Sequence, residues 1–211
     1  MKKFDTTLYF ITDSTGVEEG EFLFRVEEAL SGGVTILQLR EKNKSTIEYI
    51  HLAEKVQKLT KKYNVPLIID DRIDVALAVN AEGVHLGKED MPIATARKIL
   101  GNDFIIGSTS KTVPSAIKAY EDGADYLGVG AIYPTTTKVK TVLTSIETLA
   151  DICKSVPIPV GAIGGLNKNN VDVLKGTGIS GICVVSAIMK SENPRIETET
   201  LLKISKELIK K

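Results

Sequence analysis

Short apolar runs alternate with longer amphipathic stretches along the whole chain. The runs are rich in β-branched residues, which is typical of buried strands. In order they are Leu8–Thr12, Val34–Leu39, Pro66–Ile69, Gly83–Leu86, Phe104–Gly107, Tyr126–Gly130, Pro159–Ile163 and Gly181–Ser186. The stretches between them have helical patterns, of which the clearest are Val17–Leu30, Thr46–Lys62 and Ser115–Glu121. The pattern therefore predicts eight strands, each followed by a helix.

Eight such units fit either a closed barrel or an open doubly wound sheet. A nucleotide-binding doubly wound sheet usually has G-x-G-x-x-G after its first strand, whereas this chain has Thr12–Gly16 without that pattern. Pro/Ser-rich linkers and low-complexity tracts are absent from the sequence. We therefore predict an α/β fold, a single (β/α)₈ TIM barrel formed by one domain over residues 1–211. In such a barrel the functional groups belong at the carboxyl ends of the strands.

Composition narrows the class of partner. Lys plus Arg and Asp plus Glu each number 27, so the formal net charge is zero, and we expect neither nucleic acid nor membrane as a partner. No stretch approaches the roughly 20 apolar residues that cross a bilayer, and Asp13 ends the first apolar run too early for a signal peptide. Cys153 and Cys183 lie alone in apolar segments, which favours reduced thiols and a cytoplasmic location.

Two cations and an amide follow the second strand. Gln38, Arg40 and Lys42 are spaced by two, so they share one face while the chain stays extended. At the mouth of a barrel this face could hold a polyanion, with Arg40 offering a planar fork of donors. The alternative is a solvated loop in which Arg40 pairs with Glu41.

Carboxylates follow the third and fourth strands. Asp70 and Asp71 end the third, and Asp90 follows the fourth. Mg²⁺ prefers a few carboxylates together with water and phosphate oxygens. Helix capping is the competing interpretation, because Asp71 precedes a helix expected from Ile73 and Asp90 precedes Pro92 at an expected first helical position.

The remaining strand ends carry hydroxyls, glycines and a lysine. Ser108–Thr112 either binds phosphate or caps the next helix, and Thr135–Lys138 is either a closing lid or a polar loop. Gly164–Gly165 and Val185–Ser186 occupy the usual phosphate position of such barrels. His51 and His85 lack a nucleophile or a second ligand at a recognisable spacing, which favours structural roles. No cofactor fingerprint is visible.

Taken together and in this order, these residues resemble the thiamine-phosphate synthase family. The resemblance extends from Leu8 to about Met189, and its most specific segments are 38–42, 83–87, 128–138, 162–165 and 184–188. It implies a transferase that joins hydroxymethylpyrimidine pyrophosphate to thiazole phosphate, with Mg²⁺ as cofactor and these small molecules as partners. The leaving pyrophosphate departs first and the thiazole nitrogen attacks the resulting cation. No protein nucleophile is needed.

The resemblance also implies roles for individual residues. The residues expected to act on the pyrophosphate are Arg40, Lys42, Thr109 and Lys138. Further pyrimidine-side substrate contacts are expected from Gln38 and Asp70. The expected Mg²⁺ ligands are Asp71 and Asp90. The thiazole phosphate is expected to contact Thr135, Thr137, Gly165, Val185 and Ser186.

The chain departs from the family pattern in three places. Asp70 stands where the family usually has Asn, Thr109 and Lys111 replace its common Ser and His, and the loop after Lys138 is shorter than usual. Two alternatives therefore stay open: a thiazole tautomerase relative, and a non-catalytic barrel that binds thiazole phosphate as a regulator. A homo-oligomer is left open as well, since no helix identifies itself as an interface.

Overall fold

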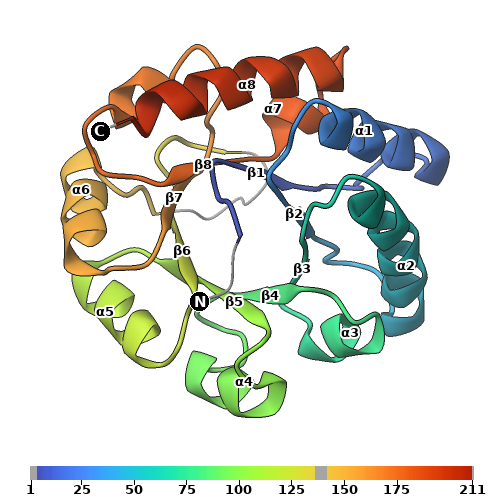
Figure 1. Cartoon of the computed structure of the whole chain (residues 1–211), viewed down its shortest axis with the longest axis horizontal. Coiled ribbons are helices and arrows are strands. Elements are labelled where there is room, and N and C mark those ends of the chain that lie inside the picture. Colours follow the sequence, from blue (N-terminus) through green and yellow to red (C-terminus); the bar gives the residue numbers. More distant parts are fainter. Residues whose placement is uncertain (1–3, 136–141, 211) are drawn as a thin grey trace.

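The computed structural model describes residues 4–135 and 142–210. Eight parallel strands pair in chain order and close where β1 meets β8, and Figure 1 shows the helices arranged around this ring. The predicted (β/α)₈ TIM barrel is confirmed. The strands are β1 (Leu8–Ile11), β2 (Ile36–Leu39), β3 (Leu67–Asp70), β4 (Gly83–Leu86), β5 (Ile105–Ser110), β6 (Tyr126–Gly130), β7 (Val160–Ile163) and β8 (Gly181–Val184). The helices are α1 (Glu19–Ser31), α2 (Thr46–Lys62), α3 (Ile73–Ala78), α4 (Ile93–Leu100), α5 (Val113–Glu121), α6 (Ile146–Ser155), α7 (Ser186–Met189) and α8 (Pro194–Leu208).

Capping side chains determine where several helices begin. Helix α2 has the predicted bounds because Ser45 and Glu48 form a reciprocal capping box at its start. Helix α5 begins at Val113, two residues before the prediction, because Thr112 caps it. Helix α1 begins at Glu19, after the predicted Val17, because the Glu18 carboxylate accepts hydrogen bonds from the first free amides.

Strand alternation divides the apolar residues into two cores. One set of side chains lies between the strands and the surrounding helices and forms the larger core. The other set fills the inside of the barrel, and its buried members are Tyr9, Ile11, Ile36, Ile68, Ile105, Tyr126 and Cys183. The barrel is thus filled rather than open. The side chains above this inner core, at the carboxyl ends of the strands, form the floor of any site.

The segment after β7 differs from the prediction of a helix after every strand. A single 3₁₀ turn, η1 (Val171–Leu174), stands there instead. Asn side chains bind nearby amides, with Asn170 Oδ1 accepting from the Asn167 amide at 2.8 Å. Gly176 and Gly178 have positive φ angles. Both features compete with helix formation.

Strand β5 is longer than predicted, because it continues from Gly107 to Ser110. The register with β6 pairs Thr109 with Gly128 and Ser110 with Val129. Thr109 is consequently a strand residue on the interior side of the barrel, with its backbone fixed by the sheet.

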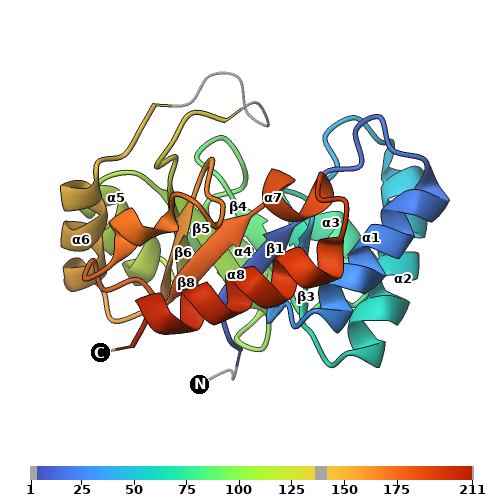
Figure 2. The same ribbon diagram turned by 90° about the horizontal axis from the view of Figure 1, so that it is seen from above.

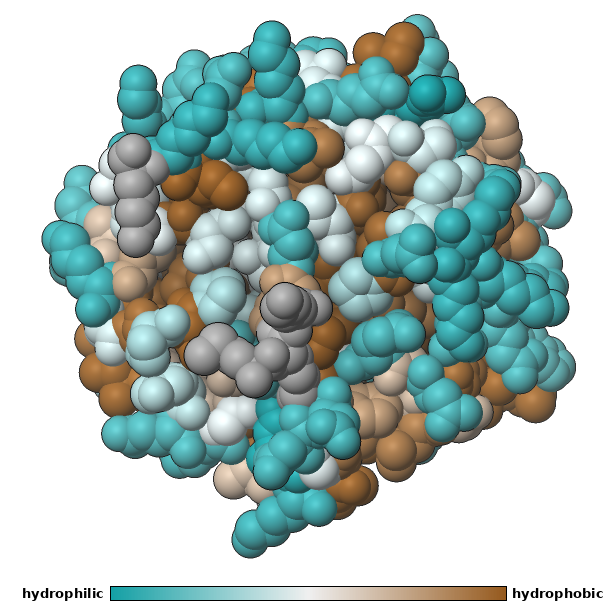
Figure 3. All heavy atoms as spheres, viewed as in Figure 1, coloured by the Kyte–Doolittle hydropathy of each residue, from teal (hydrophilic) through white to brown (hydrophobic). Residues whose placement is uncertain are grey.

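The pictures show the two ends of the barrel from different sides. Figure 2 shows α7, which follows β8, at the end of the barrel opposite the C-terminus of α8, which is the end where the strands finish. Figure 3 shows the other end, with hydrophilic side chains gathered over α2 and α8. Among the described residues, no helix is both long enough and apolar enough to cross a membrane.

Candidate active site

Asp70 is the centre of a cluster of charges at the ends of β2 and β3. Its side chain is only 9% exposed and lies 2.8 Å from Lys42 Nζ and 3.7 Å from Arg40 Nε. Lys42 also donates to Asp71. Arg40 is therefore paired with Asp70, and the alternative of a solvated Arg40–Glu41 pair is wrong. The Glu41 carboxylate instead accepts from Ser14 Oγ at 2.7 Å, because strand alternation directs it away from the barrel axis.

The charges in this cluster influence each other's protonation. Burial, followed by the neighbouring charge of Asp71, raises the pKa of Asp70 to about 6, although Lys42 and Arg40 oppose this shift. Partial burial lowers the pKa of Lys42, but the Asp70 and Asp71 carboxylates outweigh it and leave that pKa above its ordinary value. Lys42 is therefore a cation throughout the physiological pH range.

Asp71 and Asp90 come together beside this cluster. Asp71 has a φ of 60°, in the left-handed region, and its amide donates to the His85 carbonyl at 2.9 Å. Asp90 Oδ2 accepts from the Gly87 amide at 2.7 Å. The pKa of Asp90 lies above its ordinary value, because burial and a hydrogen bond with the Asp71 side chain raise it. The Gly87 amide opposes this shift. Two carboxyl groups from adjacent strand ends therefore lie within hydrogen-bonding reach of each other.

Helix capping does not account for these two aspartates. The N-cap of α3 is Arg72, and that cap has no side-chain hydrogen bond. Pro92 is itself the N-cap of α4, not its first helical residue. Both capping interpretations are therefore wrong. Within residues 4–135 and 142–210, no group of three or more His, Cys, Asp or Glu could hold a metal. A metal bound here would therefore have two carboxylates, Asp71 and Asp90, as its protein ligands.

Gln38 and Thr109 both face the interior, below the charged cluster. Gln38 Nε2 donates to the Tyr9 hydroxyl at 2.8 Å, and Thr109 Oγ1 lies 2.9 Å from His85 Nε2. Withdrawal from water lowers the pKa of His85 to about 4, so its ring is neutral at pH 7. Sequence reasoning assigned no contact to His85. Its position on the same strand face as Gly83, opposite Val84 and Leu86, is the one signal that directs it inward.

The other side of the mouth is built from the ends of β6, β7 and β8. Gly165 has a φ of 66°, and a Cβ there would lie 2.8 Å from the Pro134 carbonyl oxygen, so the β6 and β7 segments pack closely. Thr135 is half-buried in the same region. Val185 is the N-cap of α7, and the exposed Ser186 is its first residue. Thr137 and Lys138 lie outside the described residues.

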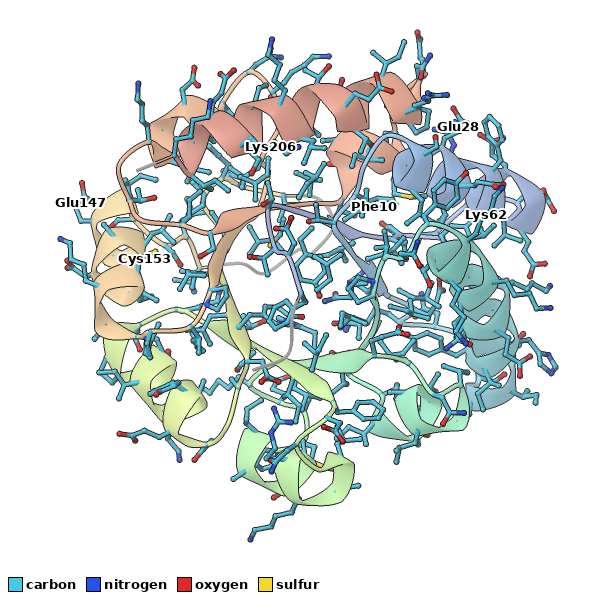
Figure 4. All side chains as sticks on the ribbon, in the orientation of Figure 1. Phe10, Glu28, Lys62, Glu147, Cys153 and Lys206 are labelled. Carbon is cyan, nitrogen blue, oxygen red and sulfur yellow. The ribbon has the colours of Figure 1, made fainter. Side chains whose placement is uncertain are left out.

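Both cysteines are free thiols. Cys183 belongs to the inner core of the barrel, and burial raises its pKa to about 12. Cys153 lies on α6 (Figure 4), and partial burial raises its pKa to about 11. Neither is a reactive thiolate at neutral pH.

Comparison with known proteins identifies the family. A model described as thiamine monophosphate synthase matches residues 8–188. The chain belongs to this family. The resemblance found in the sequence is thereby confirmed, and with it the expected class of enzyme, a transferase of thiamine biosynthesis.

Individual family members are similar over nearly their whole length. A protein of Methanobrevibacter smithii named thiamine-phosphate synthase is 50% identical over 203 residues, which is 96% of this chain and 97% of that protein. Thiamine-phosphate synthase 2 of Streptococcus pneumoniae is 51% identical over 196 residues, 93% of each chain. The solved thiamine phosphate pyrophosphorylase of Pyrococcus furiosus is 43% identical, covers 97% of each chain and superposes with a TM-score of 0.88.

A more distant structure shares the fold alone. A 3-hexulose-6-phosphate synthase has a TM-score of 0.72 at 13% identity, over 94% of this chain and 99% of that one. The barrel is thus common to different phosphate chemistries, and function has to be argued from the residues at the strand ends.

Proposed function

We propose that the chain is a thiamine-phosphate synthase. It condenses 4-amino-2-methyl-5-hydroxymethylpyrimidine pyrophosphate with 4-methyl-5-(2-phosphooxyethyl)thiazole, giving thiamine phosphate and pyrophosphate. The observation that carries this assignment is the cluster of Arg40, Lys42 and Asp70 beside the paired Asp71 and Asp90 carboxyl groups. A site that binds only a thiazole monophosphate has no need of this cluster.

The pyrophosphate binds at the ends of β2 and β5 in this proposal. Arg40 and Lys42 supply positive charge, and Lys42 stays protonated because of its aspartate neighbours. Gln38 and Thr109 supply neutral polar contacts from the barrel interior. Lys138 is assigned to the same group by its place in the family motif.

Asp71 and Asp90 are the proposed Mg²⁺ ligands. Their carboxyl groups lie within hydrogen-bonding reach, and Asp71 makes ionisation of Asp90 less favourable, so a cation between them relieves this repulsion. Two carboxylates with water and phosphate oxygens suit Mg²⁺. When bound there, Mg²⁺ supplies charge neutralisation for the departing pyrophosphate.

A charge count supports recognition of the pyrophosphate together with the metal. The cluster itself contains two cations, Arg40 and Lys42, and three carboxyl groups, Asp70, Asp71 and Asp90. A free pyrophosphate therefore meets a surface whose positive charge is already compensated. The Mg²⁺ complex of pyrophosphate brings the missing positive charge with it.

The thiazole phosphate binds at the ends of β6, β7 and β8. Gly165 lets the backbone approach the anion, and the amides of Val185 and Ser186 stand at the start of α7. Thr135 and Thr137 are assigned hydroxyl contacts from the segment after β6. The two half-sites thus face each other across the mouth, as a reaction between two bound substrates requires.

The chemistry needs positioning and charge, and no covalent intermediate with the protein. The bond between the pyrimidine methylene carbon and the pyrophosphate oxygen breaks, and its electron pair leaves with the pyrophosphate. The electron-rich aminopyrimidine stabilises the cation that remains, and the thiazole nitrogen then forms the new C–N bond. The neutral His85 and the high-pKa thiols fit this scheme, because no nucleophile or strong base is required.

Thiamine phosphate formation tests the proposal directly. Purified protein is mixed with both substrates and Mg²⁺, and product is measured as fluorescent thiochrome. Arg40→Ala and Asp71→Ala are expected to lose at least about 100-fold in kcat/KM, the usual effect of removing an electrostatic contact to developing charge. Arg195→Ala and Asp122→Ala are the matched controls, because Arg195 pairs with Glu199 on α8 and Asp122, the C-cap of α5, pairs with the exposed Lys118, and we expect both variants to retain activity.

The same assay separates the alternatives. Product that requires both substrates and Mg²⁺, and is lost in both site variants, establishes the synthase. Tautomer interconversion of the thiazole without condensation would instead identify a tautomerase relative. Binding of thiazole phosphate without either reaction would leave the regulatory barrel, and either of these outcomes refutes the synthase.

A further inference from the structure

An uninterrupted chain of hydrogen bonds crosses the interior of the barrel beneath the mouth. Gln38 Nε2 donates to the Tyr9 hydroxyl at 2.8 Å, and the Tyr9 and Tyr126 hydroxyl oxygens are 2.6 Å apart. The Tyr126 hydroxyl lies 3.0 Å from His85 Nδ1, and His85 Nε2 lies 2.9 Å from Thr109 Oγ1. These five residues come from five different strands. The chain therefore connects the two neutral polar residues of the proposed pyrophosphate side, Gln38 and Thr109.

Donor and acceptor chemistry gives this chain a direction. An amide nitrogen donates only, so the Tyr9 oxygen accepts from Gln38 and its own proton goes to its other partner, Tyr126. The Tyr126 proton then has one acceptor among the described residues, His85 Nδ1. A neutral imidazole with Nδ1 as acceptor carries its proton on Nε2. His85 Nε2–H consequently donates to Thr109 Oγ1.

The direction matters most at the far end of the chain. Because Thr109 Oγ1 accepts from His85, its own hydroxyl proton is directed elsewhere. In the opposite direction Thr109 would donate to His85, and the Tyr9 proton would have no acceptor within the chain. These contacts therefore leave the Thr109 hydroxyl proton available to a partner other than His85, and an anionic leaving group needs such a donor.

Glycines make the space that this chain occupies. A Cβ on Gly107 would lie 2.2 Å from the Tyr126 hydroxyl oxygen and 2.6 Å from His85 Nδ1. A Cβ on Gly128 would lie 3.4 Å from His85 Cε1. The Tyr126 ring is also held edge-on by Tyr9, with 5.6 Å between ring centroids. Packing thus leaves these rings little freedom to take up other hydrogen bonds.

We propose that Tyr9, Tyr126 and His85 are positioning residues: they fix the Nε2–H tautomer of His85 and so present the Thr109 hydroxyl as a donor to the pyrophosphate. The tautomer follows from contacts within the protein, whereas the benefit to Thr109 rests on the proposed function. Tyr126 is the decisive link, because it is the only described residue that joins the Tyr9 end to the histidine.

Nitrogen NMR tests the tautomer without any substrate. The protein contains two histidines, His51 and His85. In a His51→Gln variant labelled with ¹⁵N-histidine, the signal therefore comes from His85 alone. We expect a protonated Nε2 and an unprotonated Nδ1 at pH 7. A protonated Nδ1, or two averaged shifts, would refute the proposal. This readout remains valid if the protein proves to have no synthase activity, so failure of the proposed function would be recognised separately.

Tyr126→Phe, in the same labelled background, tests whether the chain sets the tautomer. Loss of the hydroxyl is expected to move both nitrogen shifts of His85 toward averaged values. In the unlabelled protein, kcat/KM for the pyrimidine pyrophosphate should fall about tenfold, the effect of one lost hydrogen bond, while KM for thiazole phosphate changes by less than about twofold. Ser205→Ala is the matched control, because it removes a buried hydroxyl that donates to the Thr7 carbonyl and should leave tautomer and KM values unchanged.

Tyr9→Phe provides a second test in case Tyr126→Phe fails to fold. It removes the group that orients the Tyr126 proton, so averaged His85 shifts are expected again. Unchanged His85 shifts in either folded variant would overturn the proposal. Equal losses for both substrates would indicate a general loss of packing and would overturn it as well.

Discussion

Replacement of Gly165 by alanine probes the proposed thiazole-phosphate side. The residue has a φ of 66°, and an added Cβ would lie 2.8 Å from both the Pro134 carbonyl oxygen and Tyr133 Cβ. The left-handed backbone costs alanine about 1–2 kcal/mol, and a contact below 3.0 Å forces the β6 segment away. Gly176→Ala is the matched control, since its φ is 80° and its Cβ would meet no atom within 4 Å.

The two variants should therefore differ in function more than in stability. Each is expected to lower the melting temperature by about 2–4 °C per kcal/mol of backbone cost, with a further loss for Gly165→Ala from the displaced segment. In the thiochrome assay, KM for thiazole phosphate should rise about tenfold in Gly165→Ala and stay constant in Gly176→Ala. KM for the pyrimidine pyrophosphate should stay constant in both. Identical thiazole phosphate KM values in the two variants would refute the placement of the phosphate beside Gly165.

Two further predictions follow from the shifted pKa values. Burial raises the pKa of Cys183 to about 12, so iodoacetamide at pH 8 should leave this thiol unmodified in the folded protein and alkylate it only after denaturation. Mass spectrometry measures the modification, and rapid alkylation of the folded protein would contradict the burial of Cys183. Asp70 has a pKa of about 6, above its ordinary 3.8, so its ionisation opposes folding increasingly between pH 4 and 6 and fully above that. Asp70→Asn should therefore be more stable than the parent at pH 8, by at most about 3 kcal/mol, and equal to it near pH 4 in urea unfolding. A difference that does not vary with pH would contradict this assignment.

Periodicity is sufficient to predict the barrel, and with it the end at which the proposed site lies. Apolar runs of four to six residues separated by helical patterns have few other solutions, and the parallel barrel places every strand end on one face. Gln38, Arg40 and Lys42 are spaced by two, and in the structure both Arg40 and Lys42 form ion pairs with Asp70. The alternation of side chains between the two faces of a strand is a local property, so it can be recognised in a single sequence.

Errors arose where side chains compete for backbone groups. The segment after β7 could not be distinguished from a short helix by hydropathy, since Val171 and Leu174 are both buried. Asparagine and glycine conformations decide that segment, and they depend on hydrogen bonds such as Asn170 with Asn167. The pairing of Arg40 with Asp70 has a different cause, which is the register between two strands. Glu41 is its neighbour in sequence, but only the register of β2 with β3 brings Asp70 closer.

The hydrogen-bond chain through the barrel marks the limit of sequence reasoning. Alternation predicts that Tyr9, His85 and Tyr126 point inward, yet it does not say which inward side chains meet, because that depends on strand tilt and on the volume of every other residue in the layer. Gly107 and Gly128 decide the matter by leaving room for the tyrosine and the imidazole. The Nε2–H tautomer of His85 then follows from four hydrogen bonds between residues of five strands. The donor role of Thr109 is consequently a property of the closed barrel, and no single strand contains it.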